Sequence, residues 1–163
     1  MLEGIRVIEL EGIGPGPFAG MTLADLGADV VKVHRPSPTQ EDKKETLSLL
    51  DRGKRSVILN LKDQKDKHTL KGLIKGADVL IEGHRPGVME RLGFDEKTIF
   101  ELNPNIIFGR ITGWGQGGPN ATQAAHDLNY ISKTGSLWFS SNEGDNPFTP
   151  PTMVGDIGGG ALY

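Results

Sequence analysis

The chain has 163 residues, with 23 glycines, 10 prolines, no cysteine and a net charge of −3. That length suits a single domain with a substantial buried core. The lack of cysteine excludes a disulfide scaffold, a thiolate zinc site and a cysteine nucleophile, and the slight negative charge argues against a nucleic-acid partner. No apolar stretch approaches the ~18 residues of a membrane helix, so we expect no membrane partner and a cytoplasmic location.

A strand, a turn, a helix and a second strand follow one another at the start of the chain. Residues 6–10 form a short apolar run bounded by glycine, which predicts a buried strand. A turn rich in glycine and proline over residues 12–17 precedes a helix that ends near Gly27, and residues 29–33 form the next apolar run. This arrangement predicts a β-α-β unit with a right-handed crossover.

The same alternation continues through the middle of the chain. The apolar pattern predicts strands over 56–61, 78–81 and 105–111 and helices over 64–75 and 86–92, the last beginning with Pro86. The charged stretch 36–54 is predicted to be a surface loop. Alternating strands and helices predict an α/β fold, in which a parallel sheet is covered by helices on both faces.

Apolar residues follow a glycine cluster at the end of the chain. Residues 158–160 are glycines, and Ala161, Leu162 and Tyr163 come next. A naturally flexible end is one interpretation of this stretch. We expect instead that these residues begin another element, and that the chain is the N-terminal part of a longer protein.

The first turn resembles a dinucleotide-binding turn. Residues 14–19 read Gly-Pro-Gly-Pro-Phe-Ala and match the G-x-G-x-x-A pattern, in which glycine lets the backbone approach a phosphate. However, Pro15 and Pro17 lack the N–H groups that would bind that phosphate. His34 and Arg35 also stand where an NAD-binding protein carries an acidic residue. We therefore interpret the segment as a tight strand-to-helix turn rather than an NAD site.

Basic residues recur near the predicted strand ends. They are Arg35, Arg52, Lys54, Arg55, Arg85 and Arg91. Ligands bind outside the carboxyl ends of the strands in parallel α/β sheets, and converging guanidinium groups there would bind a phosphate-bearing ligand. Solvated surface charge is the alternative for each single residue. The stretch 82–87 is more specific, because a charge, a flexible backbone and a helix start follow directly behind a strand.

Two further positions have the residue types of proton-transfer chemistry. His126 lies in the polar stretch 125–130, and histidine titrates near neutral pH. A histidine at a helix start can also be a structural cap, and the sequence leaves both roles open. Asp156 lies among glycines that permit close approach of a ligand, although such stretches are commonly turns. The four histidines are scattered and no thiolate is present, so we expect no metal site.

Several motifs occur in one order along the chain and together resemble a known family. They are the stretches 2–10, 14–18, 23–33, 52–56, 59–62, 85–93, 112–116 and 126–130. With these motifs the chain resembles the α-methylacyl-CoA racemases, within the family III CoA-transferase superfamily. The resemblance covers the whole chain, and it implies that residues 1–163 are the N-terminal, CoA-binding, Rossmann-like part of a large domain.

The resemblance also implies the site residues. Catalysis would belong to His126 and Asp156. Contacts to CoA would come from Arg35, Leu59, Asn60, Leu61, Lys62, Gly83, His84, Arg85, Arg91, Ala125, Asp127, Leu128, Asn129 and Tyr130. Ala125 stands where the family commonly has glycine, which matters only if the backbone there needs a positive φ. The CoA thioester is the expected substrate, and no prosthetic group is expected.

The implied activity is racemisation at the α-carbon of a 2-methylacyl-CoA, by proton abstraction and return through an enolate. In the transferase branch of the superfamily, the aspartate that matches Asp156 is a nucleophile, and the histidine is generally absent. His126 therefore favours the racemase over CoA transfer between carboxylates. A third hypothesis is a CoA-binding fragment without activity. The resemblance further implies an interlaced homodimer for the full-length protein, and a eukaryotic source would make a mitochondrial or peroxisomal location possible.

Overall fold

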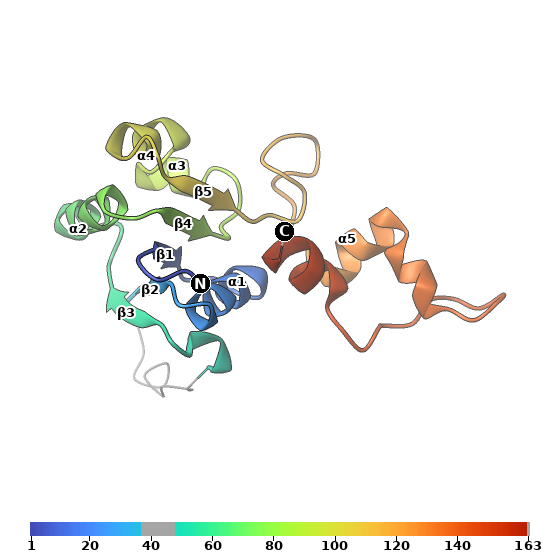
Figure 1. Cartoon of the computed structure of the whole chain (residues 1–163). Helices are drawn as coiled ribbons and strands as arrows, with labels where there is room; N and C mark the ends of the chain where they lie inside the picture. Colours follow the sequence, from blue (N-terminus) through green and yellow to red (C-terminus); the bar gives the residue numbers. More distant parts are fainter. Residues whose placement is uncertain (37–47, 163) are drawn as a thin grey trace.

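A computed structural model describes residues 1–36 and 48–162. Its centre is a five-stranded parallel sheet with the strand order β3-β2-β1-β4-β5 (Figure 1). The strands are β1 (Arg6–Leu10), β2 (Asp29–His34), β3 (Arg55–Ile58), β4 (Val79–Glu82) and β5 (Ile107–Arg110). The predicted α/β fold with a parallel sheet is confirmed.

The order of the strands reverses beside β1. The chain builds outward from β1 through β2 to β3, and then returns so that β4 pairs with the free side of β1. Val7 of β1 lies beside Val30 on one side and Val79 on the other. Connections therefore diverge from the carboxyl ends of β1 and β4, which is where open α/β sheets bind ligands.

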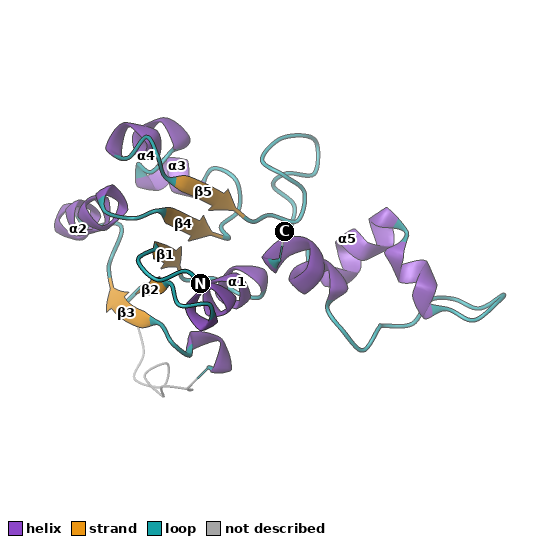
Figure 2. Cartoon of the chain, viewed as in Figure 1, coloured by secondary structure: helices purple, strands orange, loops and turns teal. Residues whose placement is uncertain are grey.

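Helices cover both faces of the sheet (Figure 2). Side chains alternate between the two faces along each strand, so Val7 and Ile8 belong to different layers. The helix α1 (Pro15–Asp25) packs against the Val7 face, where Val30 and Ile81 complete a small apolar cluster. The helices α2 (Gln64–Lys75) and α4 (Glu96–Leu102) cover the Ile8 face. The core on that face is built from Ile8, Leu10, Val31, Val33, Leu59, Leu70, Ile74, Ala77, Leu80, Met89, Phe94, Ile99 and Ile106.

Two predicted strands are too long. Pairing between β2 and β3 ends at His34 and Ile58, so β3 stops before residue 61. The backbone then turns, because the N–H of Asn60 donates to the Asp66 carboxylate at 2.8 Å rather than continuing a strand ladder. The strand β5 is likewise confined to Ile107–Arg110, since its partner β4 extends only from Val79 to Glu82.

Predicted helix boundaries differ in two places. The helix α3 (Val88–Leu92) begins after Pro86, because Gly87, with φ 85°, is its N-cap. Pro86 therefore lies before the helix and not in its first turn. The helix α4 was not predicted, although Asp95 is a clear N-cap whose side chain accepts from the N–H of Thr98 at 2.9 Å.

The stretch 36–54 is only partly a surface loop. Residues 37–47 lie outside the described part of the chain. The following residues form a short 3₁₀ helix, η1 (Leu49–Asp51), which contacts α1. The Lys54 side chain is buried against Glu9, so this end of the predicted loop belongs to the interior.

Residues 111–162, which follow β5, form a segment that we call the arm. It contains α5 (Asp127–Thr134), a short 3₁₀ helix η2 (Ser136–Ser140) and a π-helical segment η3 (Gly155–Ala161). Figure 1 shows the arm extending away from the sheet and returning, so that η3 lies beside α1. Large apolar side chains remain exposed along the arm, notably those of Trp138, Phe139 and Phe148. Within residues 1–36 and 48–162, no helix combines the length and the apolar character that crossing a membrane requires.

Candidate active site

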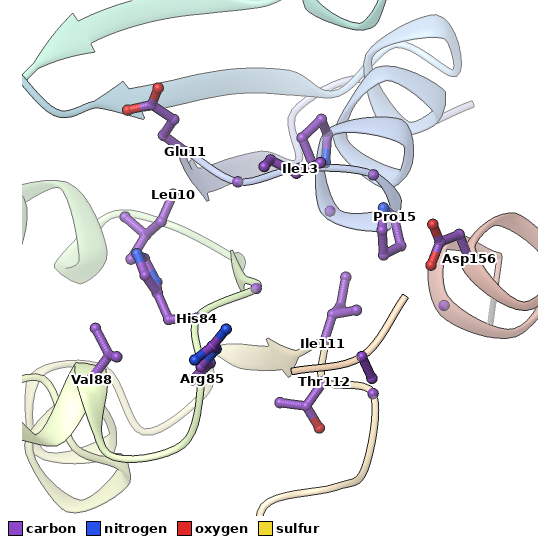
Figure 3. Close-up of a pocket in the computed structure, with 18 of the residues that line it drawn as sticks. Leu10, Glu11, Ile13, Pro15, His84, Arg85, Val88, Ile111, Thr112 and Asp156 are labelled. Atoms are coloured by element: carbon purple, nitrogen blue, oxygen red, sulfur yellow. The ribbon is translucent and has the colours of Figure 1, made fainter. Parts of the chain in front are cut away.

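A cavity of about 1170 Å³ lies at the carboxyl ends of the strands. Segments that follow β1, β2, β3, β4 and β5 all contribute to its wall, and the arm closes one side with residues from α5 and η3. Figure 3 shows His84 and Arg85, after β4, on the opposite side of the cavity from Asp156. The cavity therefore occupies the position at which the strand order reverses, as expected for a ligand site in this type of sheet.

The turn between β1 and α1 forms the wall nearest Asp156. Gly14 has φ 72°, a conformation that favours glycine, and Pro15 follows it as the first helical residue. The two prolines at positions 15 and 17 remove two of the N–H groups that a phosphate would bind at this helix start. Ile13, which was not among the predicted site residues, is 90% exposed and also lines the cavity. Its only signal in the sequence is a large apolar residue between two glycines.

Most residues implied by the resemblance line this one cavity. They are Arg35, Leu59, Asn60, Leu61, Lys62, Gly83, His84, Arg85, Ala125, His126, Tyr130 and Asp156. They come from the ends of three strands, β2, β3 and β4, and from the arm, so only the folded chain brings them together. Arg35 and Arg85 supply two guanidinium groups to the wall, which suits a ligand that carries phosphates.

Four of the implied residues lie outside the cavity wall. Arg91 is exposed on α3, and Leu128 is 41% exposed on α5. Asn129 accepts from the N–H of His126 through its side-chain oxygen at 2.9 Å, so its side chain is part of the helix start. Asp127 is buried and binds the backbone of η3. These contacts give Asn129 and Asp127 roles in holding the site together.

Besides Arg91, three of the basic residues named from the sequence do not line the cavity. Arg52 pairs with Asp25 at 2.5 Å, and Arg55 pairs with Asp29 at 2.5 Å. Lys54 pairs with the buried Glu9. The reason is topological, because Arg52 and Lys54 precede β3 and Arg55 is its first residue, so they lie on the amino-terminal side of that strand and not at its carboxyl end.

Asp156 is held at the cavity by its own backbone. Its N–H donates to Asp127 Oδ1 at 2.8 Å, which ties η3 to the first residue of α5. Burial raises the pKa of the Asp156 carboxyl, the negative charge of Asp127 raises it further, and His126 acts in the opposite direction. An aspartate in this environment retains its proton at a higher pH than an exposed one does.

A glycine before Asp156 allows η3 to approach α5 closely. A Cβ at position 155 would lie 2.6 Å from the Tyr130 ring and 2.8 Å from Ile131. The carboxylate of Asp156 itself approaches the opposite wall, since a Cβ built on Gly14 would lie 3.4 Å from its Oδ2. Close packing thus requires glycine at position 155, whereas a Cβ at position 158 or 159 would meet no atom within 4 Å.

His126 is the N-cap of α5 and also lines the cavity, so the two roles left open by the sequence coexist. Its side chain makes no capping hydrogen bond and is exposed towards the opening. Its backbone N–H is satisfied by Asn129, whereas the N–H of Asp127 has no hydrogen-bond acceptor within the described residues. Every described residue with positive φ is glycine, so Ala125 meets no backbone strain.

Glu82 anchors the β4 side of the cavity. It is fully buried, accepts from the backbone N–H of His84 at 2.7 Å and pairs with Arg110 at 2.9 Å. Burial raises the pKa of Glu82, but the hydrogen bonds from His84 and Arg110 outweigh burial and bring it below its usual value. The charged carboxylate therefore fixes the loop that carries His84 and Arg85 into the cavity.

Comparisons with known proteins place these features in a family. The model of CoA-transferase family III matches residues 2–163. The chain is 43% identical over 162 residues to the alpha-methylacyl-CoA racemase of Mus musculus, which covers 99% of this chain and 41% of that protein. It is 36% identical over 162 residues to the acetyl-CoA:oxalate CoA-transferase of Acetobacter aceti, covering 94% of this chain and 41% of that protein.

The fold of the chain also matches a solved structure. Rv3272 from Mycobacterium tuberculosis superposes with a TM-score of 0.83 at 32% identity, covering 99% of this chain and 46% of that one. The chain thus spans less than half the length of each of these three relatives.

Proposed function

The chain belongs to CoA-transferase family III, and from this premise we propose that the whole protein racemises 2-methylacyl-CoA thioesters at the α-carbon. The observation that carries the proposal is the presence of His126 and Asp156 in the wall of one cavity. A racemase needs two proton-transfer groups, one on each face of the substrate carbon. The 43% identity to a racemase supports the same choice.

The cavity wall supplies groups suited to the CoA part of the substrate. Arg35 and Arg85 would pair with phosphate oxygens, and the loop 59–62 together with Gly83 and His84 would contact the rest of the cofactor portion. CoA enters and leaves as part of the substrate in this proposal, so no prosthetic group takes part.

The proton transfer proceeds through an enolate. One base takes the α-proton, the C–H bonding electrons move into the thioester, and its carbonyl oxygen becomes negative. We assign the backbone N–H of Asp127 to that oxygen. The side chain of Asp127 lies outside the cavity wall, but its N–H directly follows His126, which lines the cavity, and has no acceptor among the described residues, whereas the N–H of His126 is already occupied. A preorganised donor of this kind lowers the barrier by roughly 3–4 kcal/mol.

His126 and Asp156 then exchange roles according to the epimer bound. One removes the α-proton, and the other returns a proton to the opposite face, which inverts the centre. The raised pKa of Asp156 helps, because a carboxyl that retains its proton closer to neutral pH is a better proton donor at that pH.

A CoA-transferase is the second function that we consider. The glycines at 155 and 158–160 leave the Asp156 carboxylate accessible, as a nucleophile requires, and the 36% identity to an acetyl-CoA:oxalate CoA-transferase supports this reading. Asp156 would attack the thioester carbonyl, expel the CoA thiolate and form a mixed anhydride. His126 has no role in that route, which is why we rank it second. For residues 1–163 alone, we propose CoA binding without turnover as a third possibility.

We also propose that the whole protein forms a homodimer. The aromatic side chains of the neighbouring residues Trp138 and Phe139, 63% and 92% exposed, support this, because large exposed apolar side chains that lie together commonly mark an interface. Sedimentation analysis of the whole protein tests the assembly, and a monomer at all concentrations would contradict it.

Product analysis separates the two activities. The whole protein is incubated with one epimer of a 2-methylacyl-CoA and an excess of isotopically labelled free carboxylate. The proposal predicts appearance of the other epimer, by chiral chromatography, with no label in the thioester. Labelled thioester without epimerisation, together with trapping of Asp156 by hydroxylamine, would establish the transferase instead.

A further inference from the structure

A buried ion pair lies on the α1 face of the sheet, and neither partner lines the cavity. Lys54 Nζ donates to Glu9 Oε2 at 2.5 Å, and the two side chains are 1% and 0% exposed. The second carboxylate oxygen, Oε1, has no hydrogen-bond partner among the described residues. Removing two charges from water is costly, and a pair with an unsatisfied oxygen recovers only part of that cost. Stability alone is therefore a poor explanation for this pair.

The helix α1, which packs over the Glu9–Lys54 pair, has a glycine at the point of contact, Gly20. A Cβ at position 20 of α1 would overlap Glu9 Oε2 and lie 3.1 Å from Lys54 Nζ. Any larger residue would push α1 away from the sheet or separate the two charges. The helix sequence is thus compatible with the pair only because position 20 lacks a side chain.

Lys54 also binds the turn over residues 14–17, which forms part of the cavity wall. Its Nζ donates to the carbonyl oxygen of Pro17 at 2.8 Å. On its other side, the same turn contacts η3, because a Cβ at position 160 would lie 2.9 Å from Pro15 Cβ. Figure 3 shows Pro15 and Asp156 adjacent at this contact. The turn is therefore held between Lys54 on the inside and the segment that carries Asp156 on the outside.

We propose that Lys54, oriented by Glu9, is a positioning residue that fixes the Gly14–Pro17 turn and, through it, the place of Asp156 in the cavity. This inference rests on the proposed function, in which Asp156 transfers a proton. The turn carries no titratable group, and the charged groups that act on Asp156 are Asp127 and His126 from the start of α5. A shift of the turn would therefore change Asp156 through its burial and position.

The test is Lys54→Met in the whole protein. We expect kcat for α-proton exchange to fall on the order of 10²-fold, as when a reacting group is misplaced by about 1 Å. The KM for the thioester should change little, since the basic residues of the cavity wall are untouched. Asp156 should also lose burial and titrate at lower pH, which carbon-13 NMR of its carboxyl group measures directly.

Two companion variants separate positioning from folding. Lys32→Met removes the neighbouring pair to Asp51, 2.6 Å long, which makes no contact with Pro17. It should keep the wild-type kcat and Asp156 titration. The double variant Glu9→Gln/Lys54→Met no longer leaves a buried charge unpaired, so it should recover stability to urea lost in Lys54→Met without recovering the rate.

Each outcome decides one of the two proposals. A wild-type rate and unchanged Asp156 titration in Lys54→Met would overturn the inference, and so would a rate restored in the double variant. A wild-type protein that does not exchange the α-proton would contradict the proposed function instead. The Asp156 titration would still decide the inference in that case, because it needs no turnover.

Discussion

Asp127 joins the two residues to which we assign proton transfer. It follows His126 in the chain, and its carboxylate accepts the backbone N–H of Asp156 at 2.8 Å. Its own backbone N–H is the donor that we assign to the enolate oxygen. Asp127, a buried residue at the start of α5, is thus next to His126 in the chain, holds Asp156 and offers a donor to the enolate oxygen.

Replacing His126 tests the assignment of the first base. His126→Ala in the whole protein should lower the epimerisation rate by about 10²–10⁴-fold, the usual contribution of a placed proton-transfer group. Affinity for CoA should be largely retained, because the arginines of the cavity remain. Epimerisation kinetics and CoA titration measure the two effects, and His68→Ala on the exposed side of α2 is the matched control. Unchanged turnover in His126→Ala would remove the residue from the mechanism.

The pH profile tests the environment of Asp156. Asp127→Asn keeps a side-chain oxygen for the Asp156 N–H but removes the negative charge that helps to raise the pKa of Asp156. Losing that charge makes ionisation of Asp156 easier, so its pKa falls and the acid limb of the kcat profile moves to lower pH. Glu143→Gln, an exposed carboxylate on the arm, serves as control. An acid limb that stays in place or moves upward would argue against the coupling.

Residue positions could be predicted from sequence where they depend on strand ends. Arg35, His84 and Arg85 each come shortly after a strand, and the carboxyl ends of parallel strands meet at one edge. The contact between Asp127 and Asp156 could not be predicted, because the two residues lie 29 positions apart in the chain. Arg52 and Arg55 were expected near the cavity, but Arg52 precedes β3 and Arg55 begins it, so both lie at the amino end of that strand.

At the scale of elements, the apolar runs in the sequence predicted where strands form, whereas the neighbouring strands in the sheet set where each strand ends. The helix α2 was predicted with its bounds because Asp63 caps it and its apolar residues recur on one face. The strand β3 could not be bounded from sequence, because the end of β2 limits its pairing. The helix α4 has a cap signal in the sequence at Asp95, but it is only seven residues long and its apolar pattern is short.

A pair of glycine substitutions tests how closely α1 packs against the sheet, with an exposed glycine of α2 as the comparison. Gly20→Ala places a Cβ against the buried Glu9 carboxylate and should destabilise the protein by about 1–3 kcal/mol. Gly72→Ala, at an exposed position of α2 with open space around it, should stabilise by about 0.5–1 kcal/mol, since alanine is the better helix former. Urea unfolding of the whole protein measures both, and equal effects of the two substitutions would contradict the packing described for α1.

At the scale of the molecule, the arm carries half of the candidate site on a segment with little apolar packing. His126 and Asp156 both belong to it, while the CoA-facing residues belong mainly to the sheet. The side chains of Trp138, Phe139 and Phe148 are exposed along the arm. The arrangement of sheet and arm is therefore expected to depend on what covers these side chains.

The exposed apolar surface predicts self-association of residues 1–163 when they are produced alone. Light scattering should give an average mass above that of one chain, rising with concentration. Phe139→Ser, which removes a side chain that is 92% exposed, should lower that mass, whereas Phe100→Ser on α4 should have a smaller effect. A monomer at every concentration would contradict this prediction.

Proton NMR of a 2-methylacyl-CoA in D₂O tests directly whether the protein removes and returns the α-proton. The whole protein is added to one epimer, and the α-hydrogen signal is followed over time. We expect this signal to disappear as deuterium enters and both epimers to accumulate, with the acyl group remaining on CoA. An α-hydrogen signal that persists while the acyl group moves to an added carboxylate would contradict racemisation and make Asp156 the nucleophile of a transferase.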